Sequence, residues 1–119
     1  MLLSPFKANN MKKLTLPQFI EGFEKYQVTC FSKDGLSLLY EHLVEELQDF
    51  IDPELFDPYH IKDVFGESTA YELVESFNFD IDDNQPLEKF KPLVIEELKG
   101  GYNFIGETKD SIVHVRNFF

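Results

Sequence analysis

Carboxylates are the residues of this sequence whose type and spacing could carry a function. In the segment from Gly35 to Pro58 the polar positions are almost all acidic, and Glu41, Glu45 and Asp49 follow one another at intervals of four residues. On a helix this interval places side chains on one face, about 6 Å apart along the axis. Such a row can imitate successive phosphates of a nucleic acid strand to a protein that binds phosphate with lysine and arginine.

The alternative interpretation is that these acids only keep the protein soluble. Solvated helix faces usually mix charges of both signs, whereas like charges four residues apart cost roughly 0.2–0.5 kcal/mol per pair. This imbalance favours a binding surface, and the solvated face stays open as the alternative. The predicted binding residues are Glu41, Glu45, Asp49 and Asp52, with Glu46, the loop acids Asp80, Asp82 and Asp83, and Tyr59 as an apolar anchor.

The charge is concentrated in the middle of the chain. The formal net charge is −11, but sixteen acidic residues and a single basic one, Lys62, lie between Asp34 and Glu88, which gives −15 there and +4 in the flanks. This central excess repels nucleic acid phosphates and anionic lipid, and it attracts basic protein surfaces most strongly at low salt. We therefore expect no direct binding to nucleic acid or membrane, and a basic protein or nucleoprotein complex as the partner.

One acidic loop has part of the pattern of a calcium site. Asp80, Asp82 and Asn84 occupy the first, third and fifth positions of a calcium-binding loop. Gln85 stands where the sharp turn requires glycine, and Lys91 stands where a bidentate glutamate is needed. We therefore expect a solvated loop and no calcium site.

Histidine and cysteine give weaker indications of chemistry. His60 lies three residues from both Asp57 and Asp63, a spacing that could form a weak divalent-metal site or an acid/base pair. A lone histidine in a short helical turn is more often a surface residue, and Cys30, the single cysteine, is expected to be a small buried thiol. The chain has no glycine-rich phosphate loop, nucleophile elbow or paired-histidine motif. We expect no catalytic residue, metal or cofactor, and a metal-dependent enzyme using Asp57, His60 and Asp63 is the least favoured alternative.

Capping signals mark where the helices begin. Thr15 is followed three residues later by Gln18, and Thr69 by Glu72, which is the pairing of a capping box. Ser32 is a third candidate N-cap, and apolar residues recur at helical spacing after each of these positions. The predicted helices are 16–26, Lys33 to Ile51, a turn or two ending at Gly66, Ala70 to Phe77, and 92–99.

Prolines and glycines mark where the helices end. The pair Asp52–Pro53 is expected to end the long helix, because the residue before proline is biased away from helical geometry. Pro86 can start a helix, but Pro92 is expected to interrupt it, so that the last helix begins only at Pro92 and stops at Gly100–Gly101.

The end of the chain favours β structure. Residues 102–106 and 111–118 are rich in β-favouring side chains around a predicted four-residue loop, Glu107 to Asp110. Either Ile112 or Val113 would face the helices, leaving His114 or Arg116 outward. The predicted fold is a helix-rich α+β domain with a C-terminal β-hairpin, with a single domain over 11–119 and a loose arm over 1–10. Without a long apolar run or signal peptide, we expect a cytoplasmic location.

The order of four sequence blocks resembles a group of small acidic phage and prophage proteins. The blocks are "PQFIEGF", "FSKDGLSLLYEHLVEEL", "FDPYHIKDVFGESTAYELVESF" and "SIVHVRNF", and the resemblance spans residues 14–118. Where such relatives tend to have a Cys-Cys pair after the aspartate of the "FDP" block, this chain has Ile61, Lys62 and Asp63, so no role of those cysteines carries over.

The resemblance implies a setting inside an infected bacterium. Acidic phage proteins often block host enzymes, restriction and CRISPR systems among them, by occupying their nucleic acid channels. The predicted function is a non-enzymatic inhibitor that binds a basic host protein or nucleoprotein complex as a nucleic acid mimic, for example as an anti-CRISPR or other anti-defence protein. The alternative is a protein–protein interaction module or homodimer that acts through its hairpin or an apolar patch without mimicry.

Overall fold

The computed structural model describes residues 13–116, where four helices precede the first strand, two helices follow it and two further strands come last. The predicted arm, residues 1–10, lies outside the described residues. No helix in residues 13–116 is long and apolar enough to cross a membrane. In chain order the elements are α2 (Leu16–Lys25), α3 (Lys33–Glu46), the 3-10 helix η1 (Gln48–Ile51), α4 (Pro58–Val64), β1 (Phe65–Ser68), α5 (Ala70–Phe77), α6 (Leu87–Gly100), β2 (Phe104–Glu107) and β3 (Ile112–Val115).

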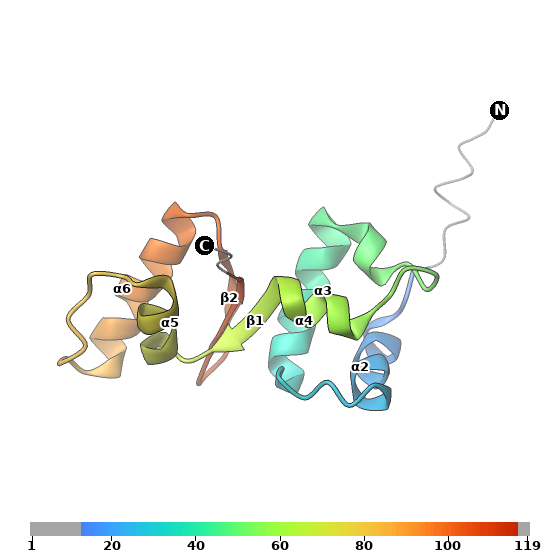
Figure 1. Ribbon diagram of the computed structural model, residues 1–119, viewed down its shortest axis with the longest axis horizontal. Helices are drawn as coiled ribbons and strands as arrows, with labels where there is room; N and C mark the ends of the chain where they lie inside the picture. Colours follow the sequence, from blue (N-terminus) through green and yellow to red (C-terminus); the bar gives the residue numbers. More distant parts are fainter. Residues whose placement is uncertain (1–12, 117–119) are drawn as a thin grey trace.

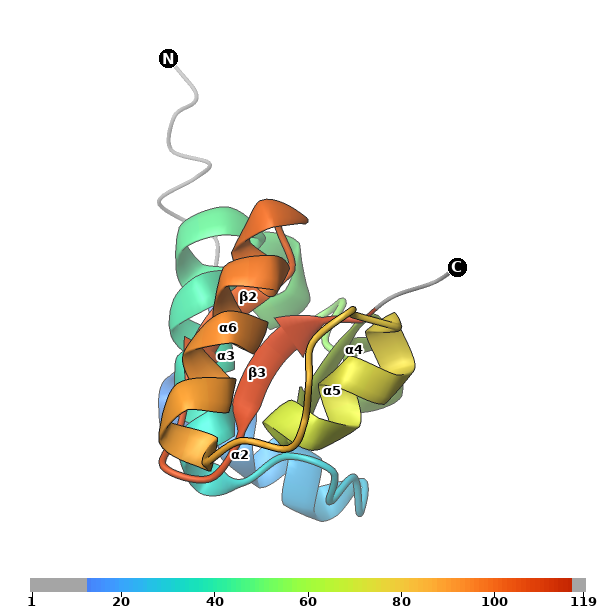
Figure 2. The ribbon, with the colours of Figure 1, turned by 90° about the vertical axis from the view of Figure 1, so that its left-hand side faces the viewer.

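The three strands form one antiparallel sheet in the order β1-β3-β2, and helices cover both of its faces. On one side lie α2, α3, η1 and α4, which we call the N-terminal lobe; on the other lie α5 and α6, the C-terminal lobe (Figures 1 and 2). The fold is therefore the predicted helix-rich α+β class with a C-terminal hairpin, to which β1 adds a third strand.

Successive residues of β3 pack into the cores of the two lobes in turn. Val113 packs into the core of the N-terminal lobe and Ile112 into the core of the C-terminal lobe, and both are 0% exposed. The expectation that only one of them would face helices was wrong, because helices cover both faces of the sheet. For the same reason His114, a candidate outward residue, is only 2% exposed, and Arg116 is half-buried.

Each lobe has its own hydrophobic core, built from residues at helical spacing. In the N-terminal lobe Phe19 packs on Phe23 with ring centroids 5.0 Å apart, and in the C-terminal lobe Tyr71 stacks on Phe90 at 4.5 Å. These aromatic contacts add specific geometry to the area that each core buries. The N-terminal core also contains Leu36, Leu39, Leu43, Ile51, Ile61 and Phe65, and the C-terminal core Leu73, Val94, Ile95 and Leu98.

The helix starts predicted from the capping residues Thr15, Ser32 and Thr69 are confirmed. Thr15 and Thr69 form the two capping boxes that open α2 and α5, and the hydroxyl of Ser32 accepts the backbone N–H of Gly35 at the start of α3. The carboxylate of Glu67 on β1 accepts the Ser32 backbone N–H and hydroxyl, both at 2.7 Å, and the hydroxyl of Ser111 in the hairpin loop. Glu67 thus ties the start of α3 to the sheet.

The long acidic helix is shorter than predicted. It ends at Glu46, because Leu47 leaves helical geometry with φ −142° and ψ 67°, and a separate 3-10 turn follows. This break turns Ile51 into the core at 0% exposure, where its carbonyl accepts the N–H of Leu14 at 2.9 Å. The side chain of Leu47, at the break itself, is 41% exposed.

The last helix is longer than predicted, since α6 begins at Leu87 and runs through Pro92. Proline lacks the N–H that would bond one turn back, so the helix loses one hydrogen bond there. The core offsets this loss, because Phe90, Val94 and Leu98 lie at four-residue intervals and are all 0% exposed.

The sheet also differs from the prediction in two details. Residues 65–68 form a strand, β1, where only a helical turn ending at Gly66 was expected; the turn itself is α4, which ends at Val64. The strand is explained by its pairing with β3, whose residues are far away in the sequence. The hairpin loop covers 108–111 rather than Glu107 to Asp110, because Glu107 still pairs with Ile112.

Candidate protein-binding surface

The acidic residues of α3 and η1 are presented to solvent around the place where α3 ends. Glu41, Glu45, Glu46 and Asp49 are exposed, whereas Asp52 is half-buried and accepts the backbone N–H of Glu54 at 2.9 Å. The buried face of the same helix holds Leu36, Leu39 and Leu43. The periodicity therefore separated core and solvent faces correctly along α3 itself.

These carboxylates have no cationic partner among residues 13–116. The ion pairs in that part of the chain join Lys62 to Asp63 at 3.5 Å and Lys91 to Glu107 at 3.3 Å. Neither pair involves the acids of α3 or η1. Their negative charge is therefore uncompensated by the described protein and is available to an external cation.

The helix itself disfavours this arrangement. The C-terminal end of an α-helix carries partial negative charge, so that basic side chains stabilise it and acidic ones destabilise it. The last turn of α3 has Glu45 and Glu46 and no basic residue. Carbonyl and carboxylate charges thus reinforce each other at this end, which is the place of α3 where an incoming lysine or arginine would be attracted most.

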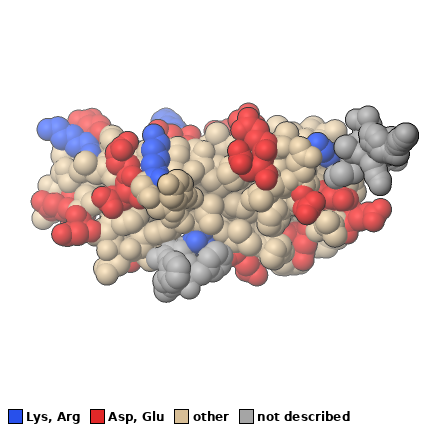
Figure 3. Space-filling view, turned by 90° about the horizontal axis from the view of Figure 1, so that it is seen from above, with Lys and Arg blue, Asp and Glu red and all other residues tan. Residues whose placement is uncertain are grey.

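The acids do not form the straight row that a continuous helix would give. Glu41 and Glu45 share a face of α3, but Asp49 belongs to η1, beyond the break at Leu47. Figure 3, which views the side on which α3 ends, shows the acidic side chains in separate groups with uncharged surface between them. We call the set Glu41, Glu45, Glu46, Asp49 and Asp52 the α3-end surface.

Tyr59, the predicted apolar anchor, is 50% exposed and forms a pair with Tyr26, which is 43% exposed. The rings meet edge to face with centroids 5.9 Å apart, and the Tyr59 hydroxyl donates to the Tyr26 carbonyl at 2.9 Å. This bond holds the Tyr59 ring in place, so an aromatic contact there would require little ordering.

The structure does not bring the loop acids to the α3-end surface. Asp80, Asp82 and Asp83 lie in the exposed loop between α5 and α6, which is in the C-terminal lobe, at the opposite end of the molecule from α2 (Figure 1). The Asp82 carboxylate accepts the backbone N–H of Asn84 at 2.9 Å, which shapes a local turn. These acids are a separate patch from those of α3.

The predicted metal residues each have a different role. Asp57 caps α4 by accepting the Tyr59 N–H at 3.0 Å, the His60 ring stacks on Phe50, and Asp63 pairs with Lys62. Within residues 13–116 no three histidine, cysteine or acidic side chains are grouped as a metal ion would require.

Cys30 is exposed, so the expectation of a buried thiol was wrong. Cys30 lies in the link between α2 and α3, and the nearby Val28 and Phe31 are buried in the core of the N-terminal lobe, whereas Cys30 is not. Partial desolvation nevertheless raises the pKa of the Cys30 thiol above its ordinary value. A raised pKa lowers the thiolate fraction at neutral pH and hence the nucleophilicity of this cysteine.

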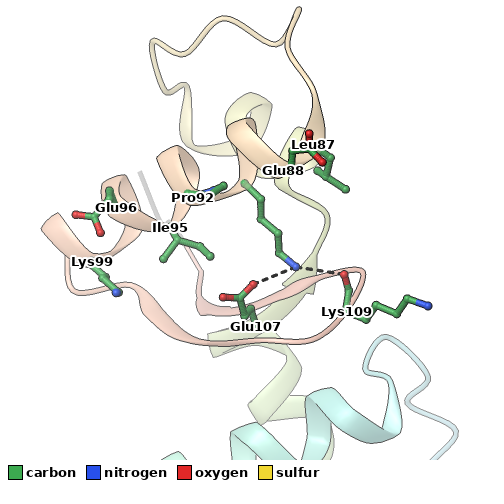
Figure 4. A pocket seen from close by; sticks show the side chains of 9 residues that line it. Leu87, Glu88, Pro92, Ile95, Glu96, Lys99, Glu107 and Lys109 are labelled. Carbon is green, nitrogen blue, oxygen red and sulfur yellow. Dashed lines mark hydrogen bonds and ion pairs between the residues drawn. The ribbon is translucent and has the colours of Figure 1, made fainter.

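Two further sites were not found from the sequence. A cavity of about 580 Å³ lies between α6 and the β2–β3 loop. In it the Lys91 ammonium group donates a hydrogen bond to the Thr108 carbonyl at 2.8 Å and forms an ion pair with Glu107 (Figure 4). A second pocket brings Ser68 and His114 together. Residues 46 positions apart give no local pattern, so only the β1–β3 pairing could have revealed that contact.

Searches against family models, curated proteins and solved structures found no match for this chain.

Proposed function

We propose that this protein is an acidic inhibitor that acts by binding, with the α3-end surface as its contact to the basic surface of a host protein that handles nucleic acid. The observation that carries the proposal is the unpaired charge at the end of α3, where Glu45 and Glu46 add to the negative end of the helix without a basic residue in the last turn. The central charge excess and the resemblance to small acidic phage proteins supply the setting.

The physical argument is one of complementarity. The lysine and arginine side chains of a phosphate-binding surface repel one another when no anion is bound, so a group of carboxylates is a suitable competitor for that surface. The acids form a group around a helix end rather than a straight row. The protein would therefore imitate the local density of negative charge on a nucleic acid. Restriction and CRISPR complexes are the candidate partners within this proposal.

The half-exposed Tyr59 ring complements the charges. Charge attraction mainly raises the association rate, whereas buried aromatic contacts slow dissociation. Tyr59 lies on α4 of the same lobe as the α3-end surface, and its ring is already held by the bond to Tyr26. The proposed contact thus consists of steering carboxylates and one ordered aromatic side chain.

The test is a competition experiment on captured partners. Immobilised wild-type protein and the Glu45→Lys/Asp49→Lys variant are incubated with bacterial lysate at low salt, and captured nucleoprotein complexes are eluted with salt or with added duplex DNA. The proposal predicts capture by the wild type, elution by both agents and loss of capture by the variant. Capture that is equal for both proteins and insensitive to DNA would overturn it.

An interaction module without mimicry is the second candidate, and exposed apolar side chains favour it. Leu55 is 60% exposed and Tyr102 is 92% exposed, and Tyr102 also has a positive φ of 61° that side chains rarely adopt. A homodimer or another apolar contact would form through such residues. Binding that barely changes between low and high salt would favour this candidate over the first.

A further inference from the structure

We propose that Ser68 is a nucleophile activated by His114, in a pocket that takes a small ester bearing an anionic group. This inference concerns the opposite lobe from the α3-end surface and is independent of the proposed inhibitor function. It rests on the relation of three side chains, Ser68, His114 and Arg116, in one cavity.

The first observation is the contact between the two reacting groups. The Ser68 hydroxyl lies 3.2 Å from Nε2 of His114, which is the distance at which a base can take the proton of a nucleophile. On its other side, Nδ1 of His114 lies 3.3 Å from the Val115 carbonyl. A carbonyl can only accept, so the proton of the neutral ring is assigned to Nδ1, and Nε2 is left to accept from Ser68.

The second observation is that the surroundings hold the imidazole neutral and fixed. His114 is 2% exposed, and Phe77 meets its ring edge to face at 5.8 Å. Desolvation lowers the pKa of His114 below its ordinary value. A buried, oriented and neutral imidazole is the form that serves as general base near neutral pH.

The third observation is a cavity that both groups reach. The cavity measures about 220 Å³ and is lined by Ser68, His114, Arg116, Glu72, Ser76 and Phe77. Its size admits only a small substrate. Ser68 is the last residue of β1, directly before the cap of α5, so its hydroxyl stands at the edge of the sheet rather than inside it.

Arg116 supplies the positive charge in this cavity. Its Nε donates to the Lys62 carbonyl at 2.7 Å, which fixes the side chain. A Cβ atom at Gly66 would lie 3.0 Å from Cε1 of His114 and 3.1 Å from Cζ of Arg116, so glycine makes room for the two side chains together. No carboxylate of residues 13–116 lies within ion-pair distance of Arg116, and Glu72, the acidic residue of the lining, accepts the Thr69 N–H at 2.8 Å.

These groups define a balanced reaction. The Ser68 oxygen forms a bond to the ester carbonyl carbon while its proton moves to Nε2 of His114. The ester C–O bond then breaks, and the departing alkoxide takes the proton from Nε2 of His114 and leaves as an alcohol. A water molecule then attacks the carbonyl carbon of the acyl-serine and gives a proton to Nε2 of His114. The bond between this carbon and the Ser68 oxygen breaks, the carboxylic acid leaves, and the proton returns from Nε2 to Ser68. Arg116 would hold the anionic group of the substrate or the oxyanion.

A purely structural role for the contact would tie β1 to β3 and nothing more, so the test must detect reactivity. The full-length protein is incubated with an alkyl fluorophosphonate, which transfers its phosphonyl group to an activated serine with loss of fluoride. The adduct is located by peptide mass spectrometry. The proposal predicts one adduct, on Ser68, and a labelling rate that falls roughly tenfold or more in His114→Gln.

Two matched variants and one substrate comparison complete the test. Ser37→Ala, which alters a serine of α3 outside the cavity, should label as the wild type does, and Ser68→Ala should not label. If His114→Gln fails to fold, the comparison is native against urea-unfolded wild type, with labelling expected only in the native protein. Arg116→Gln should remove a preference for an anionic over a neutral nitrophenyl ester. Labelling absent from Ser68, or equal on Ser68 and Ser76, would overturn the proposal.

Discussion

The helices α3 and α6 pack on opposite faces of the same sheet, and both have 14 residues. Each begins with an acidic residue in its first turn, Asp34 or Glu88, which the helix dipole favours. They differ at the other end, where α6 has Lys99 in its last turn and α3 has no basic residue but Glu45 and Glu46. The last turn of α6 also contains Glu97, so Lys99 balances an acidic residue there, whereas no basic residue balances Glu45 and Glu46 in the last turn of α3.

A second contrast concerns pairing. In the C-terminal lobe the Lys91 side chain is only 13% exposed and is held by Glu107 and the hairpin loop, so its charge helps to attach α6 to the sheet. The acids at the end of α3 are held by no cation of the described chain. The charge of Lys91 therefore supports the fold, whereas the acids at the end of α3 have no such role among the described residues, and we propose that they serve binding.

The largest expected effect concerns the strand that the two lobes share. Ile112→Ala and Val113→Ala each empty space in one of the two cores and should each cost roughly 2–4 kcal/mol of unfolding free energy. If the lobes form one cooperative unit, urea unfolding followed by circular dichroism will show a single transition at lower urea for both variants. Two separate transitions in either variant would show that the lobes unfold independently.

The next effect concerns the attachment of α3 to the sheet. Glu67→Gln keeps the size of the side chain but weakens three hydrogen bonds to a charged acceptor, and it should cost roughly 1–3 kcal/mol. Glu107→Gln removes the half-exposed partner of Lys91 and is the matched control, with an expected loss below about 1 kcal/mol. Thermal melts of both variants check this order, and a larger loss for Glu107→Gln would reverse our view of which carboxylate is structural.

A smaller effect is a pH dependence of stability that arises from His114, on the face of the sheet that packs against the C-terminal lobe. Because burial lowers the pKa of His114 in the folded protein, the unfolded chain binds this proton more readily. Stability from this residue is therefore fully present above the unfolded pKa near 6.5 and decreases as the pH falls towards the folded pKa. Melting temperatures of wild type and His114→Gln between pH 7.5 and 5 should show a steeper loss for wild type. Parallel curves would exclude His114 as the source.

The smallest effect tests the contrast between α3 and α6 directly. Glu46→Lys places a cation at the negative end of α3 and should raise stability by roughly 0.3–1 kcal/mol. Lys99→Glu makes the opposite change in α6 and should lower stability by a similar amount. Urea midpoints at low and high salt measure both, and the effects should shrink with salt. A loss of stability in Glu46→Lys would show that this acid has a structural role after all.

The parts of the fold that the sequence predicts are those that depend on neighbours in the chain. Capping residues, for example Thr15 and Thr69, bond within three residues of themselves, and the bounds predicted for α5 are those observed. The break after Glu46 and the passage of α6 through Pro92 were not predictable in this way. In both cases a nearby side chain, Ile51 or Phe90, packs into a core formed by residues from distant parts of the chain, and this packing favours the observed backbone.

The same distinction between local and long-range contacts applies to the candidate site. That Glu41 and Glu45 share an exposed face follows from helical periodicity alone. The separation of Asp82 from that surface, and the meeting of Ser68 with His114, depend on how β1 pairs with β3. The sequence contains no local signal for that pairing, because each strand is only four residues long.

The most direct test of the account is the affinity of the captured partner for three proteins: wild type, Glu41→Lys/Glu45→Lys, and Asp82→Lys/Asp83→Lys. The two variants change net charge equally, one on the α3-end surface and the other on the separate loop patch. We predict that the α3 variant binds at least roughly tenfold more weakly, and that the loop variant stays within about twofold of wild type at physiological salt, where long-range charge is screened. Equal weakening by both variants, or full binding by the α3 variant, would contradict the assignment of binding to the end of α3.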